Sequence, residues 1–184
     1  MLDDPPSARH AELLEKAYAY VLRHGLSGVS LRPLAEAIGS SPGVLMFLFE
    51  SKDGLVRALL ARSRTAELEL MAQVRAAGGD AAEAVERLWG WLAAPEHRGL
   101  LRLWAEGYGR SLVDPDGPWG GFAAQGVRDW LALLSEILGP PDALTRATAT
   151  LAVLRGALLD LLATGDADRT TTAVHAQLRA LAGS

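Results

Sequence analysis

Lys52 is the side chain whose position suggests the most specific chemistry. Ser51-Lys52-Asp53 has the cap residue and the charges expected where a helix begins. Backbone N–H groups and the helix dipole favour an anion at such a start, so a lysine there is suited to hold a phosphate. An ordinary solvated lysine is the alternative interpretation. Ser30 and Ser41 are expected first to cap two further helices and second to donate hydrogen bonds to phosphates.

Residues that could catalyse a reaction or bind a metal are few and scattered. The chain contains no cysteine, which excludes disulfides and thiolate ligands. The four histidines lie far apart, and only Glu96, beside His97, places a carboxylate next to one of them. No glycine-rich phosphate loop and no nucleophile motif occurs. We therefore expect no catalytic residue, no metal and no cofactor, and a small helical enzyme is the least supported function.

The elements that must position Lys52 and the two serines lie in residues 30 to 53. A first short helix with one apolar face ends at Gly39, because glycine tolerates the left-handed backbone that often closes a helix. Ser41-Pro42 then begins a second helix with a cap residue followed by proline. Phe49 ends this helix, and a third follows directly. This arrangement predicts a helix-turn-helix, whose second helix enters a DNA major groove.

The second helix of this motif carries mainly apolar side chains. Val44, Met46, Phe47 and Leu48 have no side-chain hydrogen-bond donors, and Gly43 offers only its backbone. Donors normally contact phosphates and base edges and thereby fix the register of a protein on DNA. The sequence therefore predicts an unusual recognition surface.

Three interpretations of this apolar helix remain open. In the first, it docks through thymine methyl groups, backbone N–H groups and the flanking Ser40, Ser41 and Lys52. In the second, Met46 and Leu48 point into the domain core and only the other two large side chains face outward. In the third, DNA binding is lost. A mixture of the first two is favoured.

The bulk composition is that of a globular protein. Hydrophobic residues make up 49% and charged residues 22% of the chain. Its 184 residues are enough for one compact unit or for a small domain plus a larger one. The N-terminal Met-Leu-Asp-Asp-Pro-Pro lacks the features of a signal peptide, and no run of about 18 apolar residues occurs. We therefore expect a soluble cytoplasmic protein without a membrane span.

The charge distribution fits an N-terminal nucleic-acid surface only weakly. The formal net charge of the chain is −4. Residues 1 to 64 hold eight Lys/Arg against seven Asp/Glu, a balance of +1, and the remainder holds ten against fifteen, a balance of −5. The asymmetry has the sign expected for DNA binding, but electrostatics alone would not indicate it.

Helical periodicity continues to the C-terminus, and no strand alternation of useful length appears. Helices are predicted over residues 7–24, 52–77, 81–94, 96–112, 119–138, 142–163 and 168–182, in addition to the two short ones. The fold class is therefore all-α with about nine helices. The helix over 52–77 spans roughly 37 Å and can join two domains. We place these domains at residues 1–51 and 52–184.

Two features of the second half suggest burial or binding. Aromatic residues gather between positions 89 and 130, where filling of the core is the more common explanation for each one. The predicted helix over residues 142–163 is apolar around much of its girth and also carries several small residues. Such a helix is either buried in the chain or covered by a partner.

The helix-turn-helix segment resembles the N-terminal domain of the TetR/AcrR family of bacterial one-component repressors. The resemblance covers about residues 9 to 64 and depends on spacings across three helices. The matching positions are Ile38-Gly39, Gly43, Leu45, Phe49, Ser51-Lys52-Asp53 and Leu55. The recognition helix departs from the family, which usually has Thr, Tyr and His where this chain has Val44, Met46 and either Phe47 or Leu48.

The resemblance implies three sets of site residues. In the family, a side chain at the place of Arg32 can reach a base edge or a phosphate, although an exposed helix arginine without a role is the alternative. The implied DNA-binding residues are Ser30, Arg32, Ser40, Ser41, Gly43, Val44, Phe47 and Lys52. The implied effector-cavity residues are Trp89, Leu101, Trp104, Tyr108, Trp119 and Phe122. The implied dimer-interface residues are Leu151, Leu154, Leu158, Leu162, Val174, Leu178 and Leu181.

The resemblance also implies a function. We expect a homodimeric regulator, most simply a repressor, that leaves double-stranded operator DNA when a small, mostly apolar effector binds. The N-terminal three-helix domain would read the DNA, and the C-terminal helical domain would bind the effector and form the dimer. The alternative is a protein of the same fold that binds a ligand or another protein and no longer reads DNA.

Overall fold

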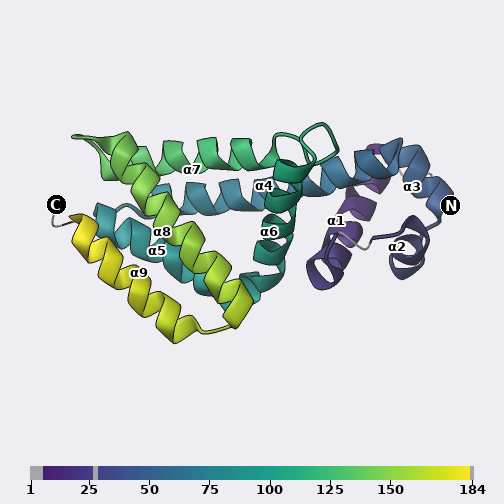
Figure 1. Ribbon diagram of the computed structural model, residues 1–184. Helices are drawn as coiled ribbons and strands as arrows, with labels where there is room; N and C mark the ends of the chain where they lie inside the picture. The colour runs from purple at the N-terminus through teal and green to yellow at the C-terminus, as the bar shows by residue number, and fades with distance from the viewer. Residues whose placement is uncertain (1–5, 27–28, 183–184) are drawn as a thin grey trace. The chain divides into compact units, whose positions relative to one another are not determined.

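The computed structural model describes the backbone of residues 6–26 and 29–182 and the side chains of 8–26 and 29–179. Every regular element in this part of the chain is helical (Figure 1), which confirms the predicted all-α fold. The α-helices are α1 (Pro6–His24), α2 (Leu31–Ala37), α3 (Pro42–Phe49), α4 (Lys52–Ala77), α5 (Ala81–Ala93), α6 (Arg98–Val113), α7 (Phe122–Leu138), α8 (Ala143–Thr164) and α9 (Ala167–Ala182).

Most helix ends lie within two residues of the predicted positions, and α4 matches at both ends. The prediction was wrong at the start of α7, which begins at Phe122 and not at Trp119. Gly121 has φ of 76°, a left-handed backbone that interrupts a helix, so the preceding residues form turns. Pro95–His97 forms a short 3-10 helix, and α6 consequently begins at Arg98.

The chain forms two compact units, which do not coincide with the predicted domain boundary. The first unit holds residues 1–65 and 102–123, and the second holds residues 66–101 and 124–184. Most of α6 thus belongs to the same unit as α1, α2 and α3. The functional division at residues 51 and 52 stays a prediction.

The first unit is built around the inward faces of α1, α2, α3 and the first half of α4. Leu13 of α1, Leu34 of α2, Leu45 of α3 and Leu59 of α4 are fully buried there. These four side chains place the helix-turn-helix on a common apolar core. Burying a leucine contributes about 1.5–3 kcal/mol, so the packing fixes the direction in which α3 faces.

The second unit contains a layer formed by α5, α8 and α9, which pack against one another (Figure 1). Trp89 of α5, Leu154 of α8 and Val174 of α9 are buried in it. Glu67 of α4 is also buried, and its carboxylate accepts a hydrogen bond from Trp130 Nε1 at 3.2 Å. The acidic group is therefore paired, as burial requires.

Helix α8 is long and apolar enough to cross a membrane by length and composition alone. It has 22 residues, and an 18-residue window reaches a mean hydropathy of 1.4. However, Leu151, Leu154, Leu158 and Leu161 lie on its inward face and are buried in the second unit. The apolar character of α8 is thus partly explained by packing within the chain, as for a core helix of a globular protein.

Candidate nucleic-acid interface and effector site

The turn between α2 and α3 is closed by backbone hydrogen bonds around Gly39. Gly39 has φ of 67°, and its N–H donates to the Glu36 carbonyl at 3.2 Å. The Ser40 N–H donates to the Ala35 carbonyl at 2.8 Å. This pair of bonds is the Schellman arrangement, which ends a helix at a left-handed glycine. The role predicted for Gly39 is confirmed.

The serines beside the two motif helices differ in what their hydroxyl groups do. Ser41 caps α3, because its Oγ accepts the Val44 N–H at 3.3 Å, and Pro42 occupies the first helical position as predicted. Ser30 stands at the cap position of α2 with an extended backbone, but its side chain accepts no capping hydrogen bond. That part of the prediction was wrong, and the exposed Ser30 hydroxyl remains available for another acceptor.

Ser40 does not fit its predicted role as a hydrogen-bond donor to DNA. Its Oγ is buried and has no hydrogen-bond partner among the described residues. The tight turn around Gly39 draws the Ser40 backbone toward Ala35 and takes the hydroxyl away from the surface. Spacing along the chain could not reveal this orientation, because only the turn geometry sets it.

Helix α3 is anchored by two side chains one turn apart. Leu45 and Phe49 are buried, and the Phe49 ring lies 4.6 Å from the ring of His10 in α1, measured between centroids. Positions i and i+4 share one face of a helix, so these residues turn the rest of α3 outward. The anchor fixes which residues α3 presents to a partner.

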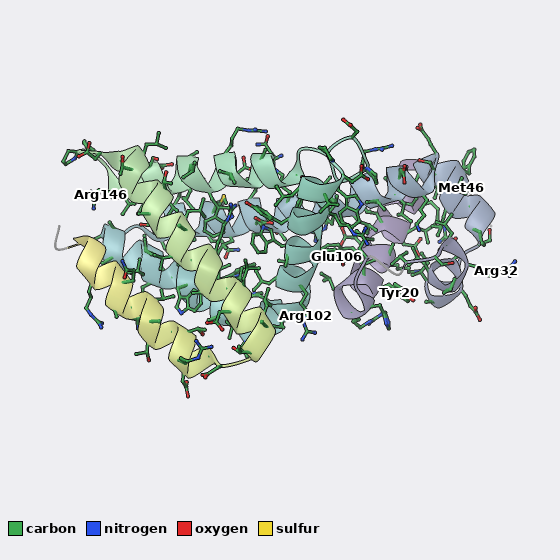
Figure 2. The ribbon with its side chains drawn as sticks, in the orientation of Figure 1. Tyr20, Arg32, Met46, Arg102, Glu106 and Arg146 are labelled. Atoms are coloured by element: carbon green, nitrogen blue, oxygen red, sulfur yellow. The ribbon has the colours of Figure 1, made fainter. Side chains whose placement is uncertain are left out.

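The outward face of α3 is apolar. The exposed fractions are 39% for Val44, 41% for Met46 and 80% for Phe47. Gly43 is exposed as well, and Leu48 is half-buried. The interpretation that Met46 points into the core was therefore wrong, since only Leu45 and Phe49 do so fully. Figure 2 labels Met46 on α3 and Arg32 on α2.

The junction of α3 and α4 places Lys52 at a helix start. Ser51 Oγ accepts the Gly54 N–H at 2.9 Å, which confirms Ser51 as the cap of α4. A Cβ atom at Gly54 would overlap the carbonyl oxygen of Phe49. Only glycine allows the two helices to approach this closely, and sequence reasoning missed this constraint. The signal was a glycine within the first turn of a helix, where other residues are favoured.

Two of the exposed basic residues of the first unit lie on helices next to α3 in the sequence and are free to contact phosphates. Arg32 and Lys52 are exposed, and neither forms an ion pair with the described residues. By contrast, Arg9 and Lys16 both bind Glu12, at 2.7 and 2.5 Å. These contacts lower the pKa of Glu12. Arg32 and Lys52 thus stand unpaired on α2 and α4, the helices that precede and follow α3 in the sequence.

Four of the predicted effector-cavity residues belong to the first unit. Trp104 and Tyr108 lie one turn apart on α6 with ring centroids 5.3 Å apart. Trp119 is buried. The Phe122 ring packs against Gly107 of α6, where an added Cβ would lie 2.9 Å from Phe122 Cε1. The structure thus places Trp104, Tyr108 and Phe122 on or against α6, and buries Trp119 in the same unit.

The other two predicted cavity residues belong to the second unit. Trp89 is buried in α5, and its Nε1 donates to Thr171 Oγ1 of α9 at 3.0 Å. Leu101 of α6 is buried as well. The bond to Thr171 gives Trp89 a structural role that the sequence did not indicate.

Glu106 of α6 has a structural role that the sequence did not indicate. Its Oε2 accepts the Leu26 N–H at 2.8 Å, next to Gly25, which has φ of 77°. Glu106 is the only acidic residue of α6, and Arg102 and Arg110 lie one turn before and after it. The hydrogen bond ties α6 to the segment that follows α1, within the first unit.

The predicted interface residues of α8 and α9 are largely occupied inside the chain. Side chains of four are buried in the second unit, namely Leu151, Leu154, Leu158 and Val174. Leu162 and Leu178 are half-buried, and the side chain of Leu181 lies outside the described residues. Residues that already pack in one subunit have little surface left for another. The expectation that these side chains themselves form a dimer interface is therefore not supported by their burial.

The exposed residues of α8 and α9 include small side chains and, on α8, the two leucines Leu144 and Leu159. Ala152, Gly156 and Leu159 of α8 are exposed, with Leu159 at 51%. A groove of about 310 Å³ runs between the helices, with Gly156 on one side and Ala173 on the other. At its rim, Arg169 binds Asp160 at 2.7 Å and lowers the pKa of that carboxyl.

These features define a class of protein. A short-turn helix-turn-helix exposes its second helix between two unpaired cations, and it is followed by a larger all-helical region. Residues 13–59 match the family described as bacterial regulatory proteins, tetR family. No curated protein matches the sequence significantly.

Solved structures of similar fold cover almost the whole chain. A transcriptional regulator from Rhodococcus sp. Rha1 is 23% identical, with 94% of this chain and 95% of that chain covered and a TM-score of 0.80. A TetR-family regulator from Cytophaga hutchinsonii is 16% identical, with 100% and 98% covered and a TM-score of 0.81. The multidrug binding protein EbrR complexed with proflavin is 27% identical, with 93% and 98% covered and a TM-score of 0.68.

Residues 13–59 thus carry the N-terminal domain of the tetR family, as the resemblance implied, and the whole chain shares the fold of solved TetR-family regulators. Its N-terminal helices form a DNA-binding domain of that family. Proteins of the family bind operator DNA, form dimers and bind small-molecule effectors. Family and fold are thus those of transcriptional regulators and not of enzymes.

Proposed function

We propose that this protein is a homodimeric, cytoplasmic repressor that binds operator DNA through α2 and α3 and leaves it when a small effector binds. The observation that carries the proposal is the exposed face of α3, which stands between unpaired Arg32 and Lys52. A large apolar surface that faces water without a partner is a mark of an interaction site. In a helix-turn-helix, that partner is the major groove of DNA.

The chemistry of this face selects a mode of DNA recognition. Val44, Met46 and Phe47 cannot donate hydrogen bonds, and the one apolar group that bases present in the major groove is the thymine methyl. We infer that these side chains contact thymine methyl groups. Lys52, Arg32, Ser30 and Ser41 then supply the phosphate contacts that hold the protein in register.

A dimer is proposed to form through the outer faces of α8 and α9. The small residues Ala152 and Gly156 allow two helices to approach closely, and Leu159 adds an exposed apolar side chain. A two-fold axis would pair equivalent patches and present two recognition helices to half-sites about one DNA turn, ~34 Å, apart. Inverted repeats are therefore the expected operators.

The effector is proposed to contact the aromatic side chains of α6. Trp104 and Tyr108 offer apolar and aromatic surface of the kind that lines small-molecule sites. EbrR, which has a similar fold, is a multidrug binding protein complexed with proflavin, an observation that supports an aromatic ligand for this chain. A ligand that moves α6 would strain the bond between Glu106 and Leu26 and so disturb the DNA-binding unit.

A mobility-shift assay with the DNA that flanks the gene of this protein tests the proposal. We expect a retarded complex whose affinity falls steeply as salt rises, because each phosphate contact releases counterions. The same assay with Lys52→Ala should give weaker binding. Absence of any salt-sensitive complex on the flanking DNA would contradict the repressor proposal.

A second candidate is a binding module of the same fold that no longer reads DNA. The lack of side-chain donors on α3 favours this alternative. It predicts that an unselected library of duplex DNA yields no enriched sequence, and that Lys52→Ala leaves the residual DNA affinity unchanged. Enrichment of an inverted repeat would exclude it.

A further inference from the structure

A pocket of about 370 Å³ lies in the second unit, among α5, α8, α9 and the last residue of α7. This volume lies within the range of ordinary small-molecule sites. Val85 of α5, Leu138 of α7 and Leu178 of α9 give it apolar walls. None of the residues that line it was predicted to contact the effector. It is therefore a separate candidate site.

The polar groups of this pocket are mainly cationic. Arg146 of α8 and Arg179 of α9 both line it, and neither forms an ion pair within the described part of the chain. The one carboxylate in the lining is Glu86, which is already engaged by His175 Nε2 at 2.9 Å. The pocket therefore has two guanidinium groups without ion-pair partners against one carboxylate, so the formal charge of these three groups is +1.

Arg146 is held in place before any ligand arrives. Its Nη1 donates to the Leu138 carbonyl at the end of α7, at 3.0 Å. Figure 2 labels Arg146 near the start of α8. A guanidinium carries five N–H donors, so this anchor leaves others for a ligand. Thr150, one turn further along α8, is buried and brings a hydroxyl to the same lining. The pocket thus offers donors at fixed positions beside apolar walls.

We propose that this pocket binds a small organic carboxylate with an apolar body. The planar guanidinium groups of Arg146 and Arg179 match the geometry of a carboxylate, which arginine binds through two parallel hydrogen bonds. Val85, Leu138 and Leu178 contact the apolar body. A fully polar anion would leave these walls without a partner, and an uncharged apolar molecule would leave the guanidinium groups without one.

Isothermal titration calorimetry with the full-length protein tests the proposal. The probes are straight-chain carboxylates from butanoate to decanoate, with the primary alcohols of equal length as uncharged controls and acetate and sulfate as polar anions. We expect saturable binding of the longer carboxylates, binding of the matching alcohols at least roughly tenfold weaker, and no saturable binding of acetate or sulfate. Alkyl phosphates of equal length test whether the head group must be a carboxylate.

Two variants locate the site. Arg179→Gln removes an exposed guanidinium with no partner among the described residues, so the fold should be retained. Arg146→Lys keeps a positive charge and loses the planar fork. Each should weaken carboxylate binding roughly tenfold or more. Arg128→Gln removes the same charge from an exposed site on α7 outside the pocket and should leave binding unchanged.

Several results would overturn the proposal. Equal affinity for carboxylates and alcohols would show a merely apolar cavity, and equal affinity for acetate would show nonspecific anion binding. Tighter binding of alkyl phosphates would assign a different head group. Unchanged affinity in Arg179→Gln and Arg146→Lys would place the ligand elsewhere. All readouts use the protein without DNA, so failure here leaves the proposed repressor function untouched.

Discussion

The carboxylate of Glu106 accepts the backbone N–H of Leu26 at 2.8 Å, across 80 positions of sequence. Leu26 follows α1, and Glu106 lies on α6 between Trp104 and Tyr108, the residues proposed to meet the effector. A ligand-sensing helix and the DNA-binding unit thus share one hydrogen bond. We regard this bond as the direct physical link between the two proposed activities.

Replacement of Glu106 tests this link. Glu106→Ala leaves the Leu26 N–H without its acceptor and should lower the free energy of unfolding by about 1–3 kcal/mol. Glu106→Gln keeps an acceptor oxygen and should cost less. We expect operator affinity to fall in the same order, measured by anisotropy alongside urea denaturation. Wild-type operator affinity in Glu106→Ala would mean that the bond does not support the DNA-binding conformation.

The phosphate contacts predict a defined salt dependence. Lys52→Ala and Arg32→Ala should each reduce the slope of log affinity against log salt by about 1, because one phosphate contact is lost. Arg110→Ala, which removes the same charge from an exposed site on α6, is the matched control and should leave the slope unchanged. A slope that falls equally in all three variants would indicate a general charge effect.

Gly54 predicts a steric effect at the junction of α3 and α4. In Gly54→Ala, the added methyl overlaps the Phe49 carbonyl, so the junction must open at a cost of about 1–3 kcal/mol. Gly109→Ala, in the middle of α6, meets no atom within 4 Å and should instead stabilise the protein by about 0.5–1 kcal/mol. Thermal denaturation compares them. Equal stability of the two variants would contradict this description of the junction.

The proposed dimer surface predicts different effects for two exposed leucines of α8. Leu159→Arg places a charge on the face with Ala152 and Gly156 and should yield a monomer in light scattering, with operator affinity lost as well. Leu144→Arg alters a leucine of similar exposure, 62% against 51%, in the first turn of α8. It should leave the dimer intact. A dimer of unchanged stability in Leu159→Arg would locate the interface elsewhere.

The features predicted most accurately from the sequence are the helix ends and caps, which depend on local chemistry. The bounds of α4, the cap at Ser51 and the stop at Gly39 follow from residues within one turn of each helix end, so no distant contact is needed to infer them. The buried face of α3 could not be predicted in this way. Leu45 and Phe49 are one turn apart, but so are Val44 and Leu48, and spacing alone does not show which pair is buried.

Orientation within the tertiary structure was less predictable. Helix α8 is apolar around much of its girth, so the pattern could not tell that Leu154 and Leu158 face inward and that Leu159 faces outward. The sequence did not show that the turn geometry buries the Ser40 hydroxyl and so removes it from contact with DNA. The pairing of Glu106 with Leu26 depends on a long-range contact that no local pattern encodes.

The central claim is that the apolar face of α3 reads operator DNA. The most direct measurement first selects binding sites from random duplex DNA and then replaces each thymine of the selected half-site with deoxyuridine, which removes only the C5 methyl group. Anisotropy titrations should show affinity falling about fourfold for each contacted methyl, since burying one such group contributes about 0.8 kcal/mol. Phe47→Ala should abolish part of that sensitivity. Equal affinity for thymine and deoxyuridine operators at every position would contradict the claim.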